Sequence, residues 1–70
     1  MKLKNYHEIV GTLENYEEKE DSIELNFVFK QSVEIPKNAI TIKDLEDCRQ
    51  KNISILHLDE KYYLNKNYMG

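Results

Sequence analysis

The chain has 70 residues, of which 40% are hydrophobic and 33% are charged, and its formal net charge is −3 at pH 7. This balance excludes a disordered chain, and the length predicts a single small domain over residues 1–70. No apolar run is long enough to cross a membrane, so we expect no membrane partner. Cys48 is the only cysteine, which excludes an internal disulfide and favours the cytoplasm.

A first strand is predicted from about Tyr6 to Tyr16, where polar and apolar residues alternate. Gly11 lies in its middle and would weaken a flat strand, so it indicates a bulge or the sharp coil of a small barrel. Acidic residues then dominate as far as Asp21. Five acids and one lysine between residues 14 and 21 leave this stretch at −4, so the remaining surface is nearly neutral. We expect Glu17 to Asp21 to form a solvated hairpin loop.

The clearest strand begins at Ser22, because its apolar side chains alternate with mostly polar ones. The alternation predicts one buried face made by Ile23, Leu25, Phe27 and Phe29. A polar break at Lys30-Gln31-Ser32 is either a tight turn or a bend. Val33 and Ile35 then continue the alternation as far as Pro36, which has no amide to donate and belongs at a strand end or edge.

A helix of about three turns is predicted from Ile42 to Lys51. Thr41 is a suitable N-cap, since its hydroxyl can accept a hydrogen bond from the amide of Asp44. Asn52 suits the left-handed conformation that often follows a helix end. The inner stripe of the helix consists of Ile42, Leu45 and Cys48. This placement predicts that Cys48 is a buried structural thiol rather than a nucleophile.

The last unit reads as a hairpin from Ile53 to Leu64, with Asp59-Glu60 as its turn or with a slightly longer loop. Residues from about 66 to 70 are expected to fray. With Asp59-Glu60 as the turn, apolar residues occupy both faces of the hairpin. One face carries Ile53, Ile55, His57, Tyr62 and Leu64. The other carries Leu56, Leu58 and Tyr63.

Together these elements predict a mainly antiparallel β domain with one short helix. The order β-β-β-α-β-β resembles the oligonucleotide/oligosaccharide-binding (OB) barrel in outline, and a small OB-like or SH3-like barrel is the leading expectation. This resemblance includes no diagnostic motif and implies no function. If residues 30–32 form only a bend, the alternative is an α+β fold, a ββαββ sheet with one face covered.

The sequence predicts no enzyme, no cofactor and no metal. His7 and His57 are 50 positions apart and lack the Cys/His or Asp/Glu spacing of a metal site. Gly11 and Gly70 are too far apart to form a glycine-rich phosphate loop. We therefore expect a non-enzymatic protein.

Protein–protein interaction is the leading function, with either self-association or a foreign protein as the partner. A small core, a hairpin with two apolar faces and a concentrated acidic loop suit a module that docks on another protein. The acidic loop would either steer the chain toward a basic partner or imitate nucleic acid on such a partner. The predicted partner-binding residues are Leu56, Leu58, Tyr63, Glu17, Glu18, Glu20 and Asp21.

The alternative is binding of single-stranded nucleic acid by the C-terminal hairpin. Aromatic rings that stack on bases and lysines that meet phosphates are the usual means of such binding. The candidates are Lys61, Tyr62, Tyr63 and Lys66. The net negative charge opposes this hypothesis.

Overall fold

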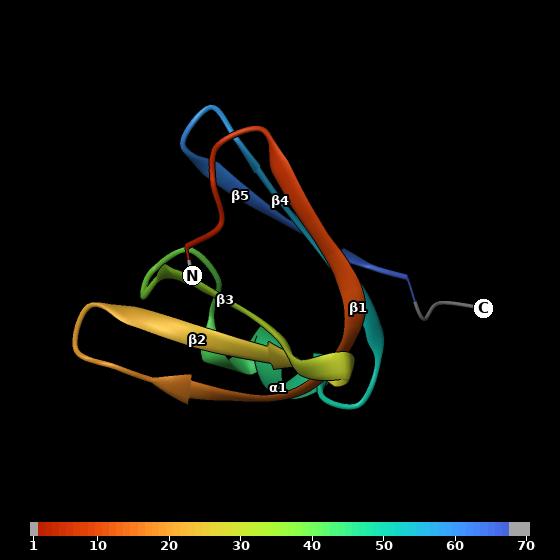
Figure 1. The fold of residues 1–70 in the computed structure, drawn as a ribbon. Coiled ribbons are helices and arrows are strands. Elements are labelled where there is room, and N and C mark those ends of the chain that lie inside the picture. Colours follow the sequence, from red (N-terminus) through yellow and green to blue (C-terminus); the bar gives the residue numbers. More distant parts are fainter. Residues whose placement is uncertain (1, 68–70) are drawn as a thin grey trace.

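The computed structural model describes residues 2–67 and contains five strands and one short helix (Figure 1). This confirms the mainly antiparallel β fold. The elements in chain order are β1 (His7–Glu18), β2 (Ser22–Phe27), the 3-10 turn η1 (Val28–Lys30), β3 (Gln31–Pro36), α1 (Ile42–Cys48), β4 (Asn52–Leu58) and β5 (Lys61–Lys66).

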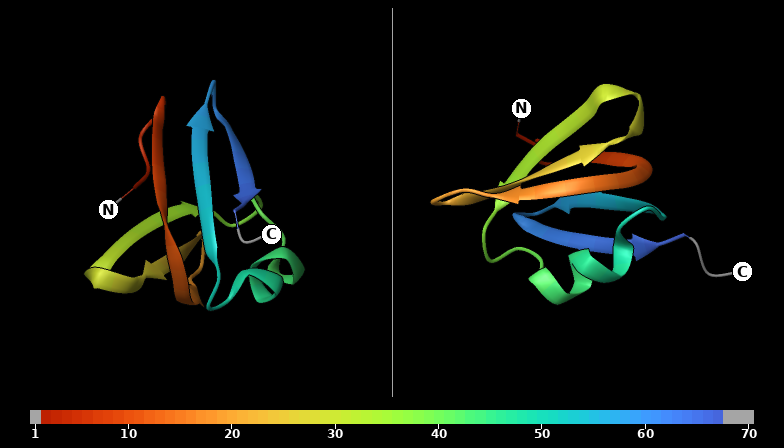
Figure 2. Two further views of the ribbon diagram at one scale, coloured as in Figure 1. Left: turned by 90° about the vertical axis from the view of Figure 1, so that its right-hand side faces the viewer. Right: turned by 90° about the horizontal axis from the view of Figure 1, so that it is seen from below.

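Strand β1 is the centre of the sheet, whose strand order is β3-β2-β1-β4-β5. Its first part, from His7 to Thr12, pairs with β4, and its second part, from Leu13 onward, pairs with β2. All of these pairs are antiparallel, and a register shift lies between Leu13 and Asn15. Figure 2 shows that β1 curves, so that β2 and β3 cross the direction of β4 and β5. The sheet therefore has a β1–β4–β5 half and a β1–β2–β3 half.

Gly11 lies where β1 passes over the core. A Cβ atom at this position would be 3.4 Å from Cδ2 of Phe27, so glycine lets the strand approach the ring closely. This agrees with the expected sharp coil. The register shift lies further along, between Leu13 and Asn15.

The prediction of a closed barrel is wrong, and the order of the strands in the sheet also differs from the predicted order. Within residues 2–67 the sheet is open, because its edge strands β3 and β5 do not pair with each other. The N-terminal segment lies beside β3 instead: Lys2 forms a parallel bridge with Glu34, and the Leu3 amide donates to the Glu34 carbonyl at 3.4 Å. The sequence pattern predicts no regular structure for this segment. The ββαββ alternative is also wrong, because β3 is a separate strand.

The core lies between the two halves and is covered by α1 at the end where β4 begins (Figure 2). Its buried hydrophobic residues are Leu3, Leu13, Ile23, Leu25, Phe27, Val33, Ile35, Ile40, Leu45, Cys48, Ile53 and Ile55. The hydroxyl of Tyr16 donates to Oε2 of Glu46, which ties α1 to β1. The helix stripe is confirmed: Leu45 and Cys48 are fully buried, and Ile42 is partly buried against the core.

The start of α1 is confirmed, but its predicted end is wrong. The Asp44 amide donates to Oγ1 of Thr41 at 3.2 Å. The helix ends at Cys48 because Gln50, with a φ of 65°, turns the chain and donates its amide to the Leu13 carbonyl at 2.6 Å. Gln50 therefore takes the left-handed conformation expected for Asn52, which is the first residue of β4.

The prediction that Phe29 belongs to the buried face of the strand is wrong. Strand β2 ends at Phe27, which pairs with Gln31, so the turn occupies Val28–Lys30 rather than residues 30–32. Phe29 has a φ of 65° at the tip of this turn, and 92% of its surface is exposed. Strand alternation cannot continue through a turn, so the ring points away from the core.

Both other hairpin turns are short. Glu17 and Glu18 belong to β1 and pair with Glu24 and Ile23, so only residues 19–21 form the acidic turn. Asp59 and Glu60 form a two-residue turn between Leu58 and Lys61, and both have positive φ, as a type I′ turn requires. Lys66 ends β5 and the Asn67 amide donates to the Asn52 carbonyl at 3.1 Å. Of the stretch expected to fray, residues 68–70 lie outside the described chain.

Candidate functional site

The outer face of the β1–β2–β3 half is hydrophilic and charged. Nζ of Lys19 lies 3.7 Å from Oε1 of Glu24 and 3.5 Å from Oε2 of Glu34. The carboxylates of Glu24 and Glu34 raise the pKa of Lys19, and Lys19 lowers the pKa of Glu34. Ser22 Oγ also donates to Glu34 Oε2 at 3.3 Å, and Asn26 donates to Asn15 at 2.8 Å. These polar groups suit a surface that faces water.

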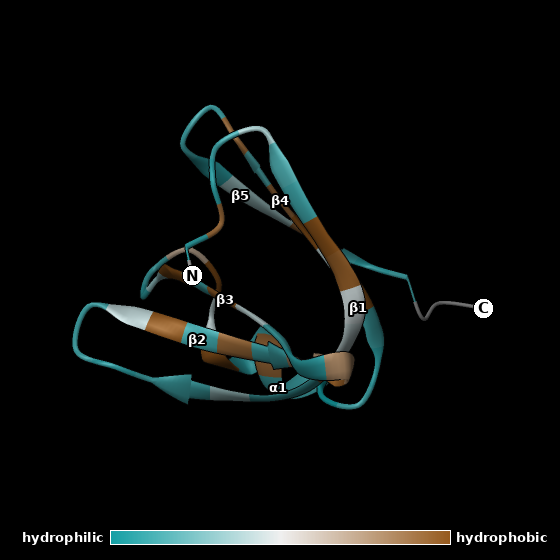
Figure 3. Cartoon of the chain, viewed as in Figure 1, coloured by the Kyte–Doolittle hydropathy of each residue, from teal (hydrophilic) through white to brown (hydrophobic). Residues whose placement is uncertain are grey.

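The outer face of the β1–β4–β5 half carries a group of neighbouring apolar side chains. Strand register places Leu56 of β4 between Tyr63 of β5 and Glu8 of β1, and sets Val10 beside Ser54. Val10 is 53% exposed and Tyr63 is 49% exposed, while Leu56 and Leu58 are half-buried. Figure 3 shows the hydrophobic stretches of β1 and β4 in this half, which include core residues such as Ile55 as well as residues of the outer face. We call Val10, Leu56, Leu58 and Tyr63 the outer apolar patch.

The helix does not cover this patch. Leu45 and Cys48 of α1 belong to the same buried cluster as Ile53 and Ile55, which point to the inner side of β4. Leu56 and Leu58 alternate with those residues and therefore lie on the opposite side. Three of the predicted partner-binding residues, Leu56, Leu58 and Tyr63, thus lie together on one exposed surface.

The predicted acidic residues lie elsewhere. Glu17 and Glu18 are at the end of β1 and Glu20 and Asp21 are in the turn that follows, so all four belong to the β1–β2–β3 half. Nζ of Lys37 lies 4.0 Å from Oε1 of Glu18, so part of this charge is paired within the chain. The acidic residues and the outer apolar patch do not form one continuous site.

The residues of the nucleic-acid hypothesis are also separated. Tyr62 stacks on His57, with ring centroids 4.1 Å apart, and packs against the core. Tyr63 points to the outer face. Nζ of Lys66 lies 4.0 Å from Oδ1 of Asp44. The two tyrosines therefore offer no common stacking surface for consecutive bases.

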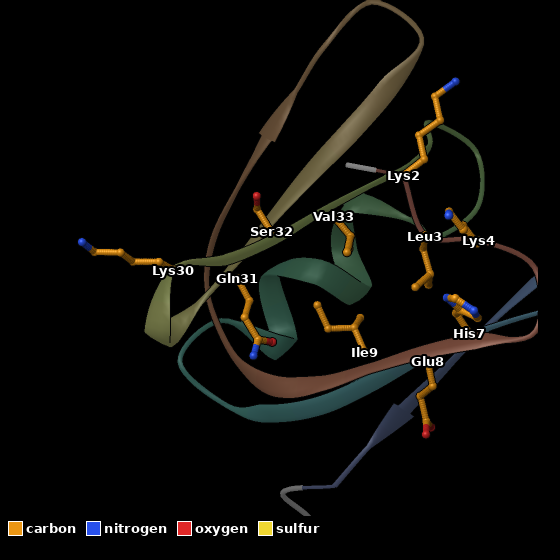
Figure 4. A pocket seen from close by; sticks show the side chains of 10 residues that line it. All are labelled: Lys2, Leu3, Lys4, His7, Glu8, Ile9, Lys30, Gln31, Ser32 and Val33. Carbon is orange, nitrogen blue, oxygen red and sulfur yellow. The ribbon is translucent and has the colours of Figure 1, made fainter.

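A hollow of about 580 Å³ lies between β3, the N-terminal segment and the start of β1 (Figure 4). Leu3, Ile9 and Val33 point into it, whereas Lys2 and Lys30 extend away. A small-molecule site needs polar groups that converge on the ligand. The charged side chains that line this hollow do not converge.

Cys48 is fully buried, as the sequence predicted, and burial raises the pKa of its thiol. The thiolate needed for nucleophilic attack is therefore disfavoured. Among residues 2–67, no group of three or more His, Cys, Asp or Glu side chains is placed to hold a metal ion.

Besides Tyr6, two exposed hydrophobic residues could not be recognised from the sequence pattern. Val10 extends the outer apolar patch onto β1, and only the β1–β4 register reveals this. Phe29 is the other, because its exposure depends on the turn that interrupts the strand pattern.

Comparisons of the chain with protein-family models, with curated proteins and with solved structures find no match. In the described part of the chain, no helix has the length and apolar character needed to span a membrane.

Proposed function

We propose that this chain is a non-enzymatic protein-interaction module that docks through the outer apolar patch. The observation that supports this proposal is the contrast between the outer faces of one sheet. One face carries a lysine held between two glutamates, and the other exposes a valine and a tyrosine beside two half-buried leucines. Contiguous apolar surface on a small domain is a common mark of a docking site.

The chemistry of the patch suits a protein partner. Tyr63 supplies a large ring with a polar tip, a residue type enriched at interface centres. Leu56 and Leu58 flank it, and Glu8 and Lys61 supply charge at the margins. Because the acidic residues Glu17, Glu18, Glu20 and Asp21 lie in the other half, we assign them to long-range steering of a basic partner rather than to the contact. We place this activity in the cytoplasm, where the lone cysteine would stay reduced.

A charge within the patch tests the proposal. Leu58→Glu should abolish partner recovery by the tagged chain from its own cells, because a desolvated interface does not tolerate an unpaired carboxylate. Phe29→Glu is the matched control, since it also replaces a large apolar residue but on a different surface. Circular dichroism must show that both variants are folded. Loss of recovery with Phe29→Glu, but not with Leu58→Glu, would refute the proposed surface.

Binding of single-stranded nucleic acid remains a second hypothesis, now limited to Lys61 and Tyr63 on the exposed side of β5. We expect no measurable binding to mixed-sequence oligonucleotides at low salt. Binding that weakens with added salt and with Tyr63→Ala would favour this function instead.

A further inference from the structure

We propose that the partner of the outer apolar patch is a second copy of this chain, packed face to face across a two-fold axis parallel to β4. This inference rests on the proposed function and names its partner. It follows from the distribution of charge around the patch.

Two exposed charges of opposite sign lie on opposite margins of the patch, apart from the acidic turn at Asp59 and Glu60. Glu8 is on β1, next to Leu56, and Lys61 is on β5, next to Leu58. Both side chains are exposed, and neither makes an ion pair with another residue between 2 and 67. The intervening β4 carries no charged residue on this side.

This arrangement is self-complementary in one orientation. A two-fold axis parallel to the strands places the β1 margin of one copy over the β5 margin of the other. Glu8 of each copy then lies near Lys61 of the other copy, with one such pair on each side of the axis. The two positions are offset by two residues along β4, or about 7 Å, which a glutamate and a lysine side chain together can span. An in-plane axis perpendicular to the strands would instead bring Glu8 near Glu8 and Lys61 near Lys61, which is repulsive.

The apolar part of the patch fits the same arrangement. Leu56 and Leu58 lie on the middle strand and therefore near the axis, where the two copies would meet their own equivalents. Val10 on β1 would lie over Asn65 of the second copy's β5, and Tyr63 of that copy is one side-chain step further along the same face. Packing of this kind would give a small domain a larger buried core than it has alone.

Analytical ultracentrifugation over a concentration series, with circular dichroism on the same samples, tests the proposal. The wild-type chain should dimerise. Glu8→Lys and Lys61→Glu should each weaken dimerisation by about tenfold or more, because each turns two attractive pairs into repulsive ones. An equimolar mixture of the two variants should dimerise as the wild type does, because both pairs are attractive in the mixed dimer.

Three results would overturn the proposal. The first is a wild-type chain that stays monomeric at about 1 mM, the concentration that corresponds to a very weak complex. The second is a mixture that dimerises no better than either variant alone. The third is a folded Leu58→Glu variant that still dimerises. A monomeric wild type whose partner recovery is lost with Leu58→Glu would refute the second copy and leave the proposed function standing.

Discussion

The imidazole ring of His57 stacks on the ring of Tyr62, with an interplanar angle of 15°. Nδ1 of the same imidazole lies 2.8 Å from the carbonyl oxygen of Leu3. A carbonyl can only accept, so this contact requires the proton on Nδ1. The amide of Leu3 donates to the carbonyl of Glu34 in β3. Leu3 therefore links β3 to β4 through its two backbone groups, on the side of the sheet where the edge strands β3 and β5 do not pair.

The first prediction concerns this connection. Leu3 is only 7% exposed, and Leu3→Ala should lower the free energy of unfolding by about 2–5 kcal/mol because a buried side chain is truncated. Lys4→Ala, at an exposed neighbouring position, should change it by less than about 0.5 kcal/mol. Urea titration of both variants measures the difference. Equal midpoints would show that the N-terminal segment does not stabilise the open side of the sheet.

A second prediction uses the two phenylalanines, which have nearly opposite environments. Phe27 is 1% exposed, so Phe27→Ala should cost about 3–5 kcal/mol, which could unfold so small a domain. Phe29 is 92% exposed, so Phe29→Ala should cost less than about 0.5 kcal/mol. Thermal melts followed by circular dichroism distinguish them. A large loss with Phe29→Ala would contradict the position of the turn at residues 28–30.

These two residues also show how far the sequence predicts the fold. Period-two alternation correctly identified Ile23, Leu25 and Phe27 as buried, because burial on one face imposes that pattern. It failed at Phe29, because nothing in the local pattern shows where a three-residue turn replaces the strand. The helix cap at Thr41 was predictable since capping depends on local side chains, whereas the helix end depends on a tertiary hydrogen bond from Gln50 to Leu13.

The candidate surface was predictable only in part. Alternation in the last hairpin was enough to place Leu56, Leu58 and Tyr63 on one side. Val10 and Glu8 could not be assigned to the same surface, because the pairing of β1 with β4 joins residues 40 or more positions apart. The open sheet could not be predicted either, because it depends on whether the distant strands β3 and β5 pair.

A third prediction tests the helix cap. Thr41→Ala should lower the free energy of unfolding by about 0.5–2 kcal/mol, because the Asp44 amide loses its acceptor. Thr41→Ser retains the hydroxyl and should be nearly neutral. Identical thermal midpoints for the two variants would rule out a stabilising role for this cap.

The charged outer face predicts a dependence on pH. Lys19 lowers the pKa of Glu34 in the folded state, so the stability due to this contact is present above the unfolded pKa and is lost as pH falls through the folded pKa. Glu34→Gln removes that contribution. The stability difference between wild type and variant should therefore shrink on acidification, and also with added salt, since the groups are exposed.

Urea titrations of the two chains at a series of acidic, neutral and alkaline pH values measure this difference. The pKa of Lys19 is raised in the folded state. The contribution of its ion pairs to the free energy of unfolding should therefore be lost at alkaline pH, as the pH rises through the folded pKa. A difference that is constant over the acidic range would show that Glu34 does not interact with Lys19 in solution.

Site-specific photo-crosslinking in the native cell tests the central claim, docking through the outer apolar patch, most directly. A benzophenone side chain would replace Tyr63 in one variant and Phe29 in the other, both exposed aromatic positions, at 49% and 92%. Exposure alone favours adducts at position 29. Docking through the patch predicts specific protein adducts from position 63 and none from position 29. Adducts from position 29 with none from position 63 would contradict it.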